Sequence, residues 1–427
     1  MDIDVPKMNL PRVVIVGGGF AGIEVAKQLR DRFQVVMVDK NNFHTFQPLL
    51  YQVATAGVEP DSIVFPLRKV FKGFRNFYFR MAEALEIIPE QNTLRTSIGS
   101  IFYDYLIIAT GSDTNYFGME ELRVNSLPMK SVREALDLRS CILQNFEMAV
   151  TTSDMREREA LMTYVIVGGG PTGVELAGAL GELKKHVLPK DYPELDLGKM
   201  KIHLVEHSPR VLATMGEKSS EKAKKYLEDL DVIVELNMRI TSYDGRSVKS
   251  EGVEKYSAAT LIWAAGVRGV NIPGIPVASI NANGRISVNE FNLAEGTKNI
   301  FALGDVAQMK TSDYPKGHPQ VAQVAIQQAT RLGKNISKGM DFQKWKPFHY
   351  RDKGSMATVG RNRAVVESKS ITTQGFFAWL IWMFVHLLFL VGFRNRIIVF
   401  FNWLISYFNY DRGMRLIIRP FSRNKKS

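Results

Sequence analysis

Cysteine is nearly absent from this chain of 427 residues, which contains Cys141 and no other. A disulfide framework needs cysteine pairs, and a dithiol redox centre needs two thiols, so one copy of the chain can build neither. We expect Cys141 to be an ordinary small residue of a core or a helix. The shortage excludes enzymes that work through a cysteine pair.

The N-terminus lacks the features of a targeting segment. Residues 1–4 read MDID, without the cationic stretch and apolar run of a secretory signal and without the Arg/Ser-rich, acid-poor character of a transit peptide. We therefore expect the body of the protein to fold in the cytoplasm.

Acidic residues are in deficit: 43 Asp and Glu face 55 Lys and Arg, and the formal net charge is +12. A basic balance favours polyanions or anionic lipid as partners. Much of the excess lies in an apolar C-terminal region, so we predict a lipid surface and not nucleic acid. The length allows two or three domains, and 45% hydrophobic residues allow a sizeable core.

The chain contains an internal repeat. Residues 13–26 read VVIVGGGFAGIEVA, and residues 164–177 read YVIVGGGPTGVELA. Each copy has a short β-branched run, then glycines, then a helical pattern, which predicts a strand, a tight turn and a helix.

The first copy carries a complete G-x-G-x-x-G pattern at Gly17, Gly19 and Gly22. These glycines allow the tight turn, the approach of a pyrophosphate to the backbone, and close helix–strand packing. The helix N-terminus then offers free N–H groups to the phosphates. Asp39 ends the next apolar run and suits a ribose, and we assign Lys40 beside it to the same dinucleotide site.

The second copy has the same pattern at Gly168, Gly170 and Gly173, and its next strand ends at Glu206. The separation is longer than usual because residues 184–199 read as an inserted excursion. A carboxylate at position 206 repels a 2′-phosphate and favours NADH, although nearby basic side chains leave NADPH open. Two fingerprints imply two dinucleotides, and the economical pair is FAD and NAD.

Three further strand ends resemble motifs of the two-dinucleotide flavoprotein reductases. These are Ala109, Thr110 and Gly111 after one strand, Gly304 and Asp305 after another, and Gly266 after a third. The resemblance implies that Asp305 holds the ribityl or pyrophosphate part of FAD and that Gly266 lies on the NAD side. Each motif, taken alone, is also compatible with a simple turn.

The finer resemblance is to the type II NADH:quinone oxidoreductases, which are single-subunit and do not pump protons. It rests on residues 41–58, 168–178 and 263–268, on an A-Q-x-A-x-Q quinone motif at 322–327, and on the apolar C-terminal run. It implies an α/β fold of two Rossmann-like domains, glutathione-reductase-like, with C-terminal membrane-associating helices. It also implies non-covalent FAD, NADH as substrate, a membrane quinone as acceptor in a respiratory chain, and no metal.

The same resemblance assigns three catalytic residues. Glu175, which we place in the first turn of the second dinucleotide helix, would position the nicotinamide or relay protons towards the quinone. Gln323 and Gln327 would contact the quinone, because residues four apart share a helical face and amides can donate to carbonyl oxygens. The alternatives are an acid favoured by the helix N-terminus, with Glu24 at the equivalent place, and two ordinary polar residues.

The C-terminal region predicts membrane attachment. Residues 375–393 carry no permanent charge and could nearly cross a bilayer, but an interfacial helix pair fits the detail better. Trp379, Trp382 and His386 share a face that suits the headgroup boundary, and Asn395, Asn402, Ser406 and Asn409 form a polar stripe. From 394 onward eight basic residues face one acid, Asp411, as anionic lipid would require.

We predict a discontinuous FAD domain at 1–125 and 283–340, an inserted NADH domain at 126–282, and a connector with membrane anchor at 341–427. The expected location is the cytoplasmic face of the cell inner membrane, peripheral and monotopic; a homodimer is left open. The rival functions are a ferredoxin- or rubredoxin-type NADH reductase and an NADH-sensing flavoprotein with slow turnover.

Overall fold

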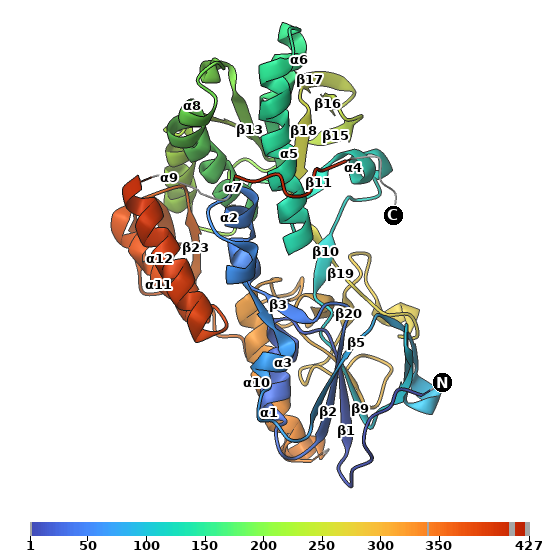
Figure 1. Ribbon diagram of the computed structural model, residues 1–427. Coiled ribbons are helices and arrows are strands. Elements are labelled where there is room, and N and C mark those ends of the chain that lie inside the picture. Colours follow the sequence, from blue (N-terminus) through green and yellow to red (C-terminus); the bar gives the residue numbers. More distant parts are fainter. Residues whose placement is uncertain (1, 340, 410–414, 423–427) are drawn as a thin grey trace. The chain divides into compact units, whose positions relative to one another are not determined.

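A computed structural model describes residues 2–339, 341–409 and 415–422 (Figure 1). The chain divides into two compact units, each assembled from three segments. The first unit contains residues 1–44, 65–113 and 267–352, and the second contains residues 45–64, 114–266 and 353–427. The domain boundaries expected from the sequence stay a prediction.

A five-stranded parallel sheet forms the centre of the first unit, in the order β21-β9-β1-β2-β5. Its strands are β1 (Arg12–Val16), β2 (Gln34–Asp39), β5 (Phe77–Met81), β9 (Tyr105–Ile108) and β21 (Ile300–Ala302). Helices α1 (Phe20–Gln28) and α10 (Ala322–Ile336) pack against each other in this unit. The inner strands β1 and β2 are buried on both faces, which explains their continuous apolar runs, whereas the edge strand β5 is only partly buried.

The second unit repeats this arrangement, with five parallel strands in the order β11-β18-β12-β13-β14. Its strands are β11 (Leu127–Pro128), β12 (Thr163–Val167), β13 (Lys201–Val205), β14 (Val232–Glu235) and β18 (Thr260–Trp263). Helix α7 (Pro171–Glu182) follows β12 as α1 follows β1. The repeat and the doubly wound α/β fold inferred from the sequence are therefore confirmed.

Small antiparallel sheets accompany the two central sheets. The first unit contains β6 (Ala84–Ile88), β7 (Thr93–Thr96) and β8 (Gly99–Phe102), and the second contains two such sheets. The strands of those two are β15 (Ile240–Tyr243), β16 (Ser247–Ser250) and β17 (Val253–Ser257), then β23 (Ser355–Thr358), β24 (Ala364–Glu367) and β25 (Thr372–Gln374).

The remaining helices and strands are short, apart from two helices of the second unit. The helices are α2 (Leu50–Ala54), α3 (Leu67–Val70), α4 (Glu120–Asn125), α5 (Val132–Thr151), α6 (Met155–Leu161), α8 (Leu188–Asp191) and α9 (Glu217–Glu228). The strands are β3 (Phe43–Thr45), β4 (Val64–Pro66), β10 (Ser112–Thr114), β19 (Val267–Gly269), β20 (Ile286–Ser287) and β22 (Ala307–Gln308).

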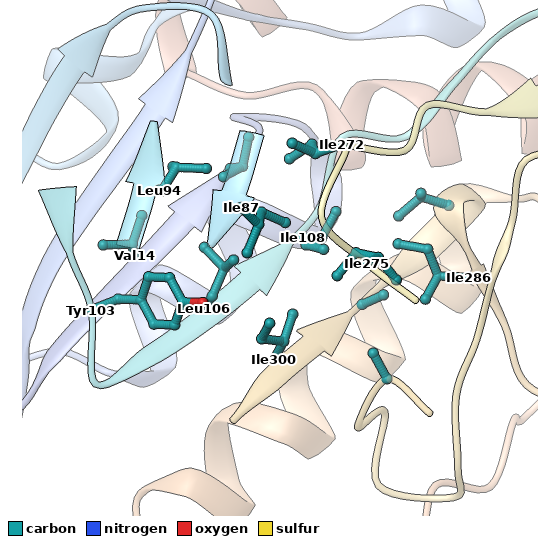
Figure 2. Packing of buried hydrophobic residues seen from close by; sticks show 14 of the residues in the cluster. Val14, Ile87, Leu94, Tyr103, Leu106, Ile108, Ile272, Ile275, Ile286 and Ile300 are labelled. Carbon is teal, nitrogen blue, oxygen red and sulfur yellow. The ribbon is translucent and has the colours of Figure 1, made fainter. Parts of the chain in front are cut away.

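An apolar core in the first unit joins the parallel sheet to the small antiparallel sheet. Val14, Leu106 and Ile108 from the parallel sheet pack with Ile87 and Leu94 from the antiparallel one, and each is almost completely buried (Figure 2). Ile272, Ile275 and Ile286, from a later part of the chain, complete this cluster. The core therefore anchors the third chain segment of the unit to the first two.

The excursion at 184–199 is largely helical. Helix α7 continues through a π-helical turn, Leu183–Val187, into α8, and Pro189 stands within the first two residues of α8, where its missing N–H costs little. The inserted excursion expected from the sequence therefore has regular structure at both ends: residues 193–195 form a turn and a bend, and a 3-10 helix, Leu197–Lys199, follows them.

Two apolar helices follow the sheet β23-β24-β25, namely α11 (Phe376–Phe389) and α12 (Phe393–Asn409) (Figure 1). Among the described residues, no helix is both long enough and apolar enough to cross a bilayer. The expectation that the face with Trp382 meets the headgroups is wrong, and the polar stripe of α12, for which the sequence predicted no direction, turns inward at Asn395. Trp382 is 1% exposed, and Asn395, 4% exposed, donates to the main-chain oxygens of Asp61 and Val64.

These helices turn their polar side chains towards the body of the second unit because buried amides and indoles need hydrogen-bond partners. Asn402 donates to Glu59, and Trp403 donates to Gln52 at 2.7 Å. The exposed side chains are instead large and apolar: Phe376, Phe377, Leu380, Phe384, Leu388, Phe389, Phe393, Ile397, Phe400, Phe401, Leu404, Ile405 and Phe408. Asp411, Arg412, Arg423, Lys425 and Lys426 lie outside the described residues.

Candidate active site

The turn between β1 and α1 has the geometry of a dinucleotide cradle. Gly17 has φ +109°, and a Cβ there would lie 2.3 Å from the carbonyl oxygen of Ala109. A Cβ on Gly22 would lie 1.8 Å from the oxygen of Gly17, so close packing requires glycine at both positions. Gly19 faces open space at the start of the helix, where N–H groups are free to bind a pyrophosphate.

Asp39 braces this turn. Its carboxylate accepts hydrogen bonds from the main-chain N–H of Gly18 at 2.6 Å and of Asn41 at 2.7 Å. Burial raises its pKa, whereas the two N–H donors and the positive charge of exposed Lys40 lower it. Each oxygen keeps a lone pair that can accept from a ribose hydroxyl, which stays the predicted role of Asp39. Within the described residues, the interaction found for Lys40 is this electrostatic effect on Asp39, and its role at the dinucleotide site stays a prediction.

The strand ends after β9 and β21 lie in the same unit. The hydroxyl of Ser112 donates to Asp305 at 2.5 Å, and Thr110 donates to the main chain of Val270. Gly111 has φ +74° and faces open space, as a residue beside a bound cofactor would. The motif Ala109–Gly111 and Asp305 therefore belong to one polar corner, and these residues fit the FAD that the sequence implies.

A glutamine that the sequence analysis did not assign to the site fixes this corner. Gln328 on α10 is 1% exposed, and its side-chain oxygen accepts from the N–H of Gly304 at 2.8 Å. Gly304 has φ +71°, and Gln320 donates to the main-chain oxygen of Asp305 at 3.1 Å. The sequence offered one sign of this role, a glutamine directly after the quinone motif. Its partner, Gly304, is too distant in the sequence for the contact to be predicted.

The turn between β12 and α7 repeats the first cradle. Gly168 has φ +116°, a Cβ on Gly173 would lie 1.9 Å from the oxygen of Gly168, and Gly170 faces open space. Glu206 accepts from the N–H of Gly169 at 2.5 Å and from that of Ser208 at 2.8 Å, and it pairs with exposed His207. A Cβ on Gly266 would lie 3.0 Å from the ring of Phe117, so the strand end after β18 is also close-packed.

Glu175 is a buried carboxyl group in the second unit. It is 7% exposed, and it accepts hydrogen bonds from the indole N–H of Trp382 at 3.2 Å and from the main-chain N–H of Thr358 at 3.4 Å. Burial raises its pKa from 4.5 to about 8, against the lowering effect of both hydrogen bonds. The group therefore holds a proton at neutral pH and can release it within the range of ordinary acid–base catalysis.

The helix N-terminus does not account for this glutamate. Helix α7 begins at Pro171, so Glu175 lies beyond the first turn, and the predicted first-turn position is wrong. Glu24, at the equivalent place of α1, contacts Gln28 at 2.8 Å and Thr330 at 3.0 Å in a partly exposed polar cluster. The two glutamates share a sequence position but have different environments.

The two glutamines of the quinone motif also differ. Both lie on α10, as the helical spacing predicts. Gln327 is fully paired: its amide donates to the main-chain oxygen of Arg351 and accepts from the N–H of Arg351, both at 3.0 Å. The side-chain oxygen of Gln323 is buried and has no hydrogen-bond partner within the described part of the chain. Gln323 is therefore the better candidate for a ligand contact.

A hollow in the second unit adjoins Glu175. It lies between α2, α7, α11, α12 and the sheet β23-β24-β25, and its walls include Tyr51, Gln52, Arg361, Trp379 and Tyr407. Thr358 and Trp382, the two donors to Glu175, also line it. The wall combines aromatic side chains with several polar ones, a mixture that small-molecule sites also have. No cluster of His, Cys, Asp or Glu suited to a metal occurs among the described residues.

Comparison with known proteins identifies two family regions. Residues 11–329 match the pyridine nucleotide-disulphide oxidoreductase family, and residues 353–409 match the NDH2 C-terminal domain. Cys141 is buried and is the single cysteine of the sequence, so one copy of the chain cannot form the disulfide of the first family's name.

Individual relatives cover almost the whole chain. The type II NADH:quinone oxidoreductases NdhA and Ndh of Mycobacterium tuberculosis are 37% and 36% identical to it, over 95% and 97% of this chain and 89% and 92% of theirs. The solved structure of NDH2 from Plasmodium falciparum in complex with NADH has a TM-score of 0.86 at 21% identity, and it covers 96% of this chain and 100% of its own. That likeness is one of fold, over almost the whole chain. The chain belongs to the family of type II NADH:quinone oxidoreductases.

Proposed function

We propose that this chain oxidises NADH through a bound FAD and passes the electrons to a membrane quinone without pumping protons. The observation that carries the proposal is the pair of equivalent cradles, one per unit, in a chain of this family. FAD, when bound, accepts a hydride from NADH and delivers two electrons to the acceptor. The overall change is NADH + H⁺ + quinone → NAD⁺ + quinol.

The first cradle would hold FAD and the second NADH. Gly17, Gly19 and Gly22 would make room for the FAD pyrophosphate at the N-terminus of α1. Asp39 would bind the ribose of FAD, and Asp305 its ribityl or pyrophosphate part. Glu206 supports a preference for NADH because it is 8% exposed beside Gly169, where a carboxylate repels a 2′-phosphate.

The remaining residues handle the quinone and its protons. Quinone reduction consumes two protons, and the carboxyl group of Glu175 holds one at neutral pH. Gln323 would donate its amide N–H to a quinone carbonyl oxygen, and its buried side-chain oxygen, without a partner among the described residues, could accept from a hydroxyl of the quinol product. Gln327 is instead bonded to the main chain of Arg351.

We propose a peripheral location on the cytoplasmic face of the inner membrane; the two apolar helices support the attachment to a membrane, and the choice of membrane and face stays a prediction. The outward side chains of these helices include Phe377, 72% exposed, and Phe408, 73% exposed. Exposing so many large apolar side chains to water is unfavourable, which indicates that this surface meets lipid. Exposed Arg394 and Arg419 add positive charge for anionic lipid. A homodimer stays a prediction without structural support.

Steady-state and absorbance measurements test the proposal together. Purified protein on vesicles, with NADH and a short-chain quinone, should turn over rapidly and show flavin bleaching by NADH and recovery with quinone. NADPH should be much the poorer donor. Activity with iron–sulfur proteins but not with quinone would instead indicate a ferredoxin-type reductase, and slow turnover with every acceptor would indicate a sensor.

A further inference from the structure

Helix α11 has two chemically different faces. Phe377, Phe384 and Leu388 are 72%, 63% and 50% exposed, whereas Ala378 and Trp382 are 0% and 1% exposed. Residues four apart share a face, so Ala378 and Trp382 form an inward stripe opposite the apolar outward one. The helix that is expected to meet lipid thus also places an indole in the interior of the second unit.

That indole contacts Glu175 directly. The N–H of Trp382 donates to Glu175 Oε1 at 3.2 Å, and the other hydrogen bond to this carboxyl group, within the described residues, comes from the main chain of Thr358. Trp382 is therefore the side chain on which the orientation of the carboxyl group depends. An indole has a single donor and no acceptor, so it favours the charged carboxylate over the neutral acid.

Aromatic neighbours hold Trp382 in place. Its ring stacks on His386 with the ring centroids 4.0 Å apart. The ring centroids of Tyr51 and Trp403 lie 6.5 Å and 5.6 Å from that of Trp382. His386 Nδ1 lies 2.7 Å from the main-chain oxygen of Trp382 and donates to it. Burial lowers the pKa of His386 to about 4, so its ring stays neutral at neutral pH.

The charged and titratable groups around this site come from several elements. Tyr51 on α2, His386 on α11, Glu182 on α7 and Arg361 beside β24 line or adjoin the hollow. The guanidinium of Arg361 donates to the main-chain oxygen of Ser406 and lies over the ring of Tyr407, and the main-chain N–H of Arg361 donates to Glu182. Burial and the two hydrogen bonds account for the properties of Glu175 without a charged partner.

We propose that Trp382 is a positioning residue for Glu175: helix α11, whose outward face is apolar, supplies the N–H that orients this carboxyl group. The inference rests on the proposed function only in taking Glu175 as a proton donor during quinone reduction. Loss of the N–H should leave the carboxyl group less well oriented and harder to deprotonate. Hydride transfer from NADH should not depend on it.

The variant Trp382→Phe tests this, because phenylalanine keeps an aromatic ring and removes the N–H. Stopped-flow absorbance of the full-length holoprotein would follow flavin reduction by NADH and reoxidation by a short-chain benzoquinone across pH 6 to 10. We expect reduction within about twofold of wild type. The rate of flavin reoxidation at its optimal pH should be lower than in wild type. The fall of that rate at alkaline pH (its alkaline limb) should occur about one pH unit higher, which corresponds to a tenfold change in proton affinity.

Two further variants make the result specific. In a Glu175→Gln background the alkaline limb is absent, so adding Trp382→Phe should change reoxidation little. Trp345→Phe is the matched control: it removes another buried indole N–H, bonded to the oxygen of Gly339 at 2.7 Å in the first unit. It should leave both half-reactions and the pH limb unchanged.

An infrared readout keeps the test independent of turnover. The C=O band of protonated Glu175, assigned by its loss in Glu175→Gln, should titrate at higher pH in Trp382→Phe than in wild type. The inference would be overturned if a flavin-replete Trp382→Phe variant kept the wild-type pH profile of reoxidation and the wild-type titration of the infrared band. It would also be overturned if Trp382→Phe slowed reoxidation equally in the Glu175→Gln background. If wild type itself fails to reduce the quinone, the proposed function fails instead.

Discussion

At the scale of single residues, the buried carboxyl group of Glu175 is the feature with the largest chemical consequence. A carboxyl group in this position is costly to ionise unless donors surround it, and only two donors reach it among the described residues. Its pKa of about 8 therefore reflects burial that two hydrogen bonds offset in part. The raised pKa of Glu175 affects both proton transfer and the stability of the protein.

The stability of the protein should depend on pH through this residue. Because the pKa of Glu175 is raised from 4.5 to about 8 on folding, its stabilising contribution is full below pH 4.5 and is lost as pH rises to about 8. Glu175→Gln cannot ionise, so the difference in unfolding free energy between wild type and variant should shift against wild type over that range. Urea unfolding of both holoproteins from pH 4.5 to pH 9 measures it, and a difference independent of pH would contradict the assignment.

The two motif glutamines should respond differently to alanine. Gln323→Ala should raise the quinone KM with little change in melting temperature, because its oxygen bonds to no described residue. Gln327→Ala removes two hydrogen bonds to Arg351 and should lower stability by about 1–3 kcal/mol. Steady-state kinetics and thermal unfolding of both variants separate the roles; matching effects would show that the distinction is mistaken.

At the scale of elements, the two cradles are equivalent in backbone geometry but should be separable in function. Gly22→Ala places a Cβ against Gly17 in the first unit, and Gly173→Ala does the same against Gly168 in the second. The first variant should lose FAD, whereas the second should keep its yellow colour and show a raised KM for NADH. Flavin content and NADH titration check this, and loss of FAD from both would argue against separate sites.

The strands, turns and glycine roles followed from the sequence because each depends on local periodicity and on steric limits near the turn. The contacts of Gln328 with Gly304 and of Trp382 with Glu175 did not, since each joins elements far apart in the chain. Periodicity identified the polar stripe of α12 but not its direction. An amide stripe can face headgroups or buried carbonyl groups equally well, and Asn395 takes the second option.

At the scale of the whole molecule, the C-terminal helices should attach the enzyme to lipid. Phe377→Ser with Phe384→Ser removes two exposed apolar side chains, each worth about 1.5–3 kcal/mol when fully buried. Flotation with anionic vesicles should fall at least tenfold, while NADH oxidation with a water-soluble acceptor stays unchanged. Val277→Ser, 85% exposed in the first unit, is the control that should bind as wild type does; undiminished flotation of the double variant would place the lipid contact elsewhere.

The absorbance spectrum of the purified protein during one catalytic cycle tests the central claim most directly. We predict a yellow protein whose visible flavin absorbance bleaches on addition of NADH and, in the absence of oxygen, returns on addition of a short-chain quinone. A protein that stays colourless after FAD is supplied, or a flavin that NADH reduces but quinone does not reoxidise, would contradict the account.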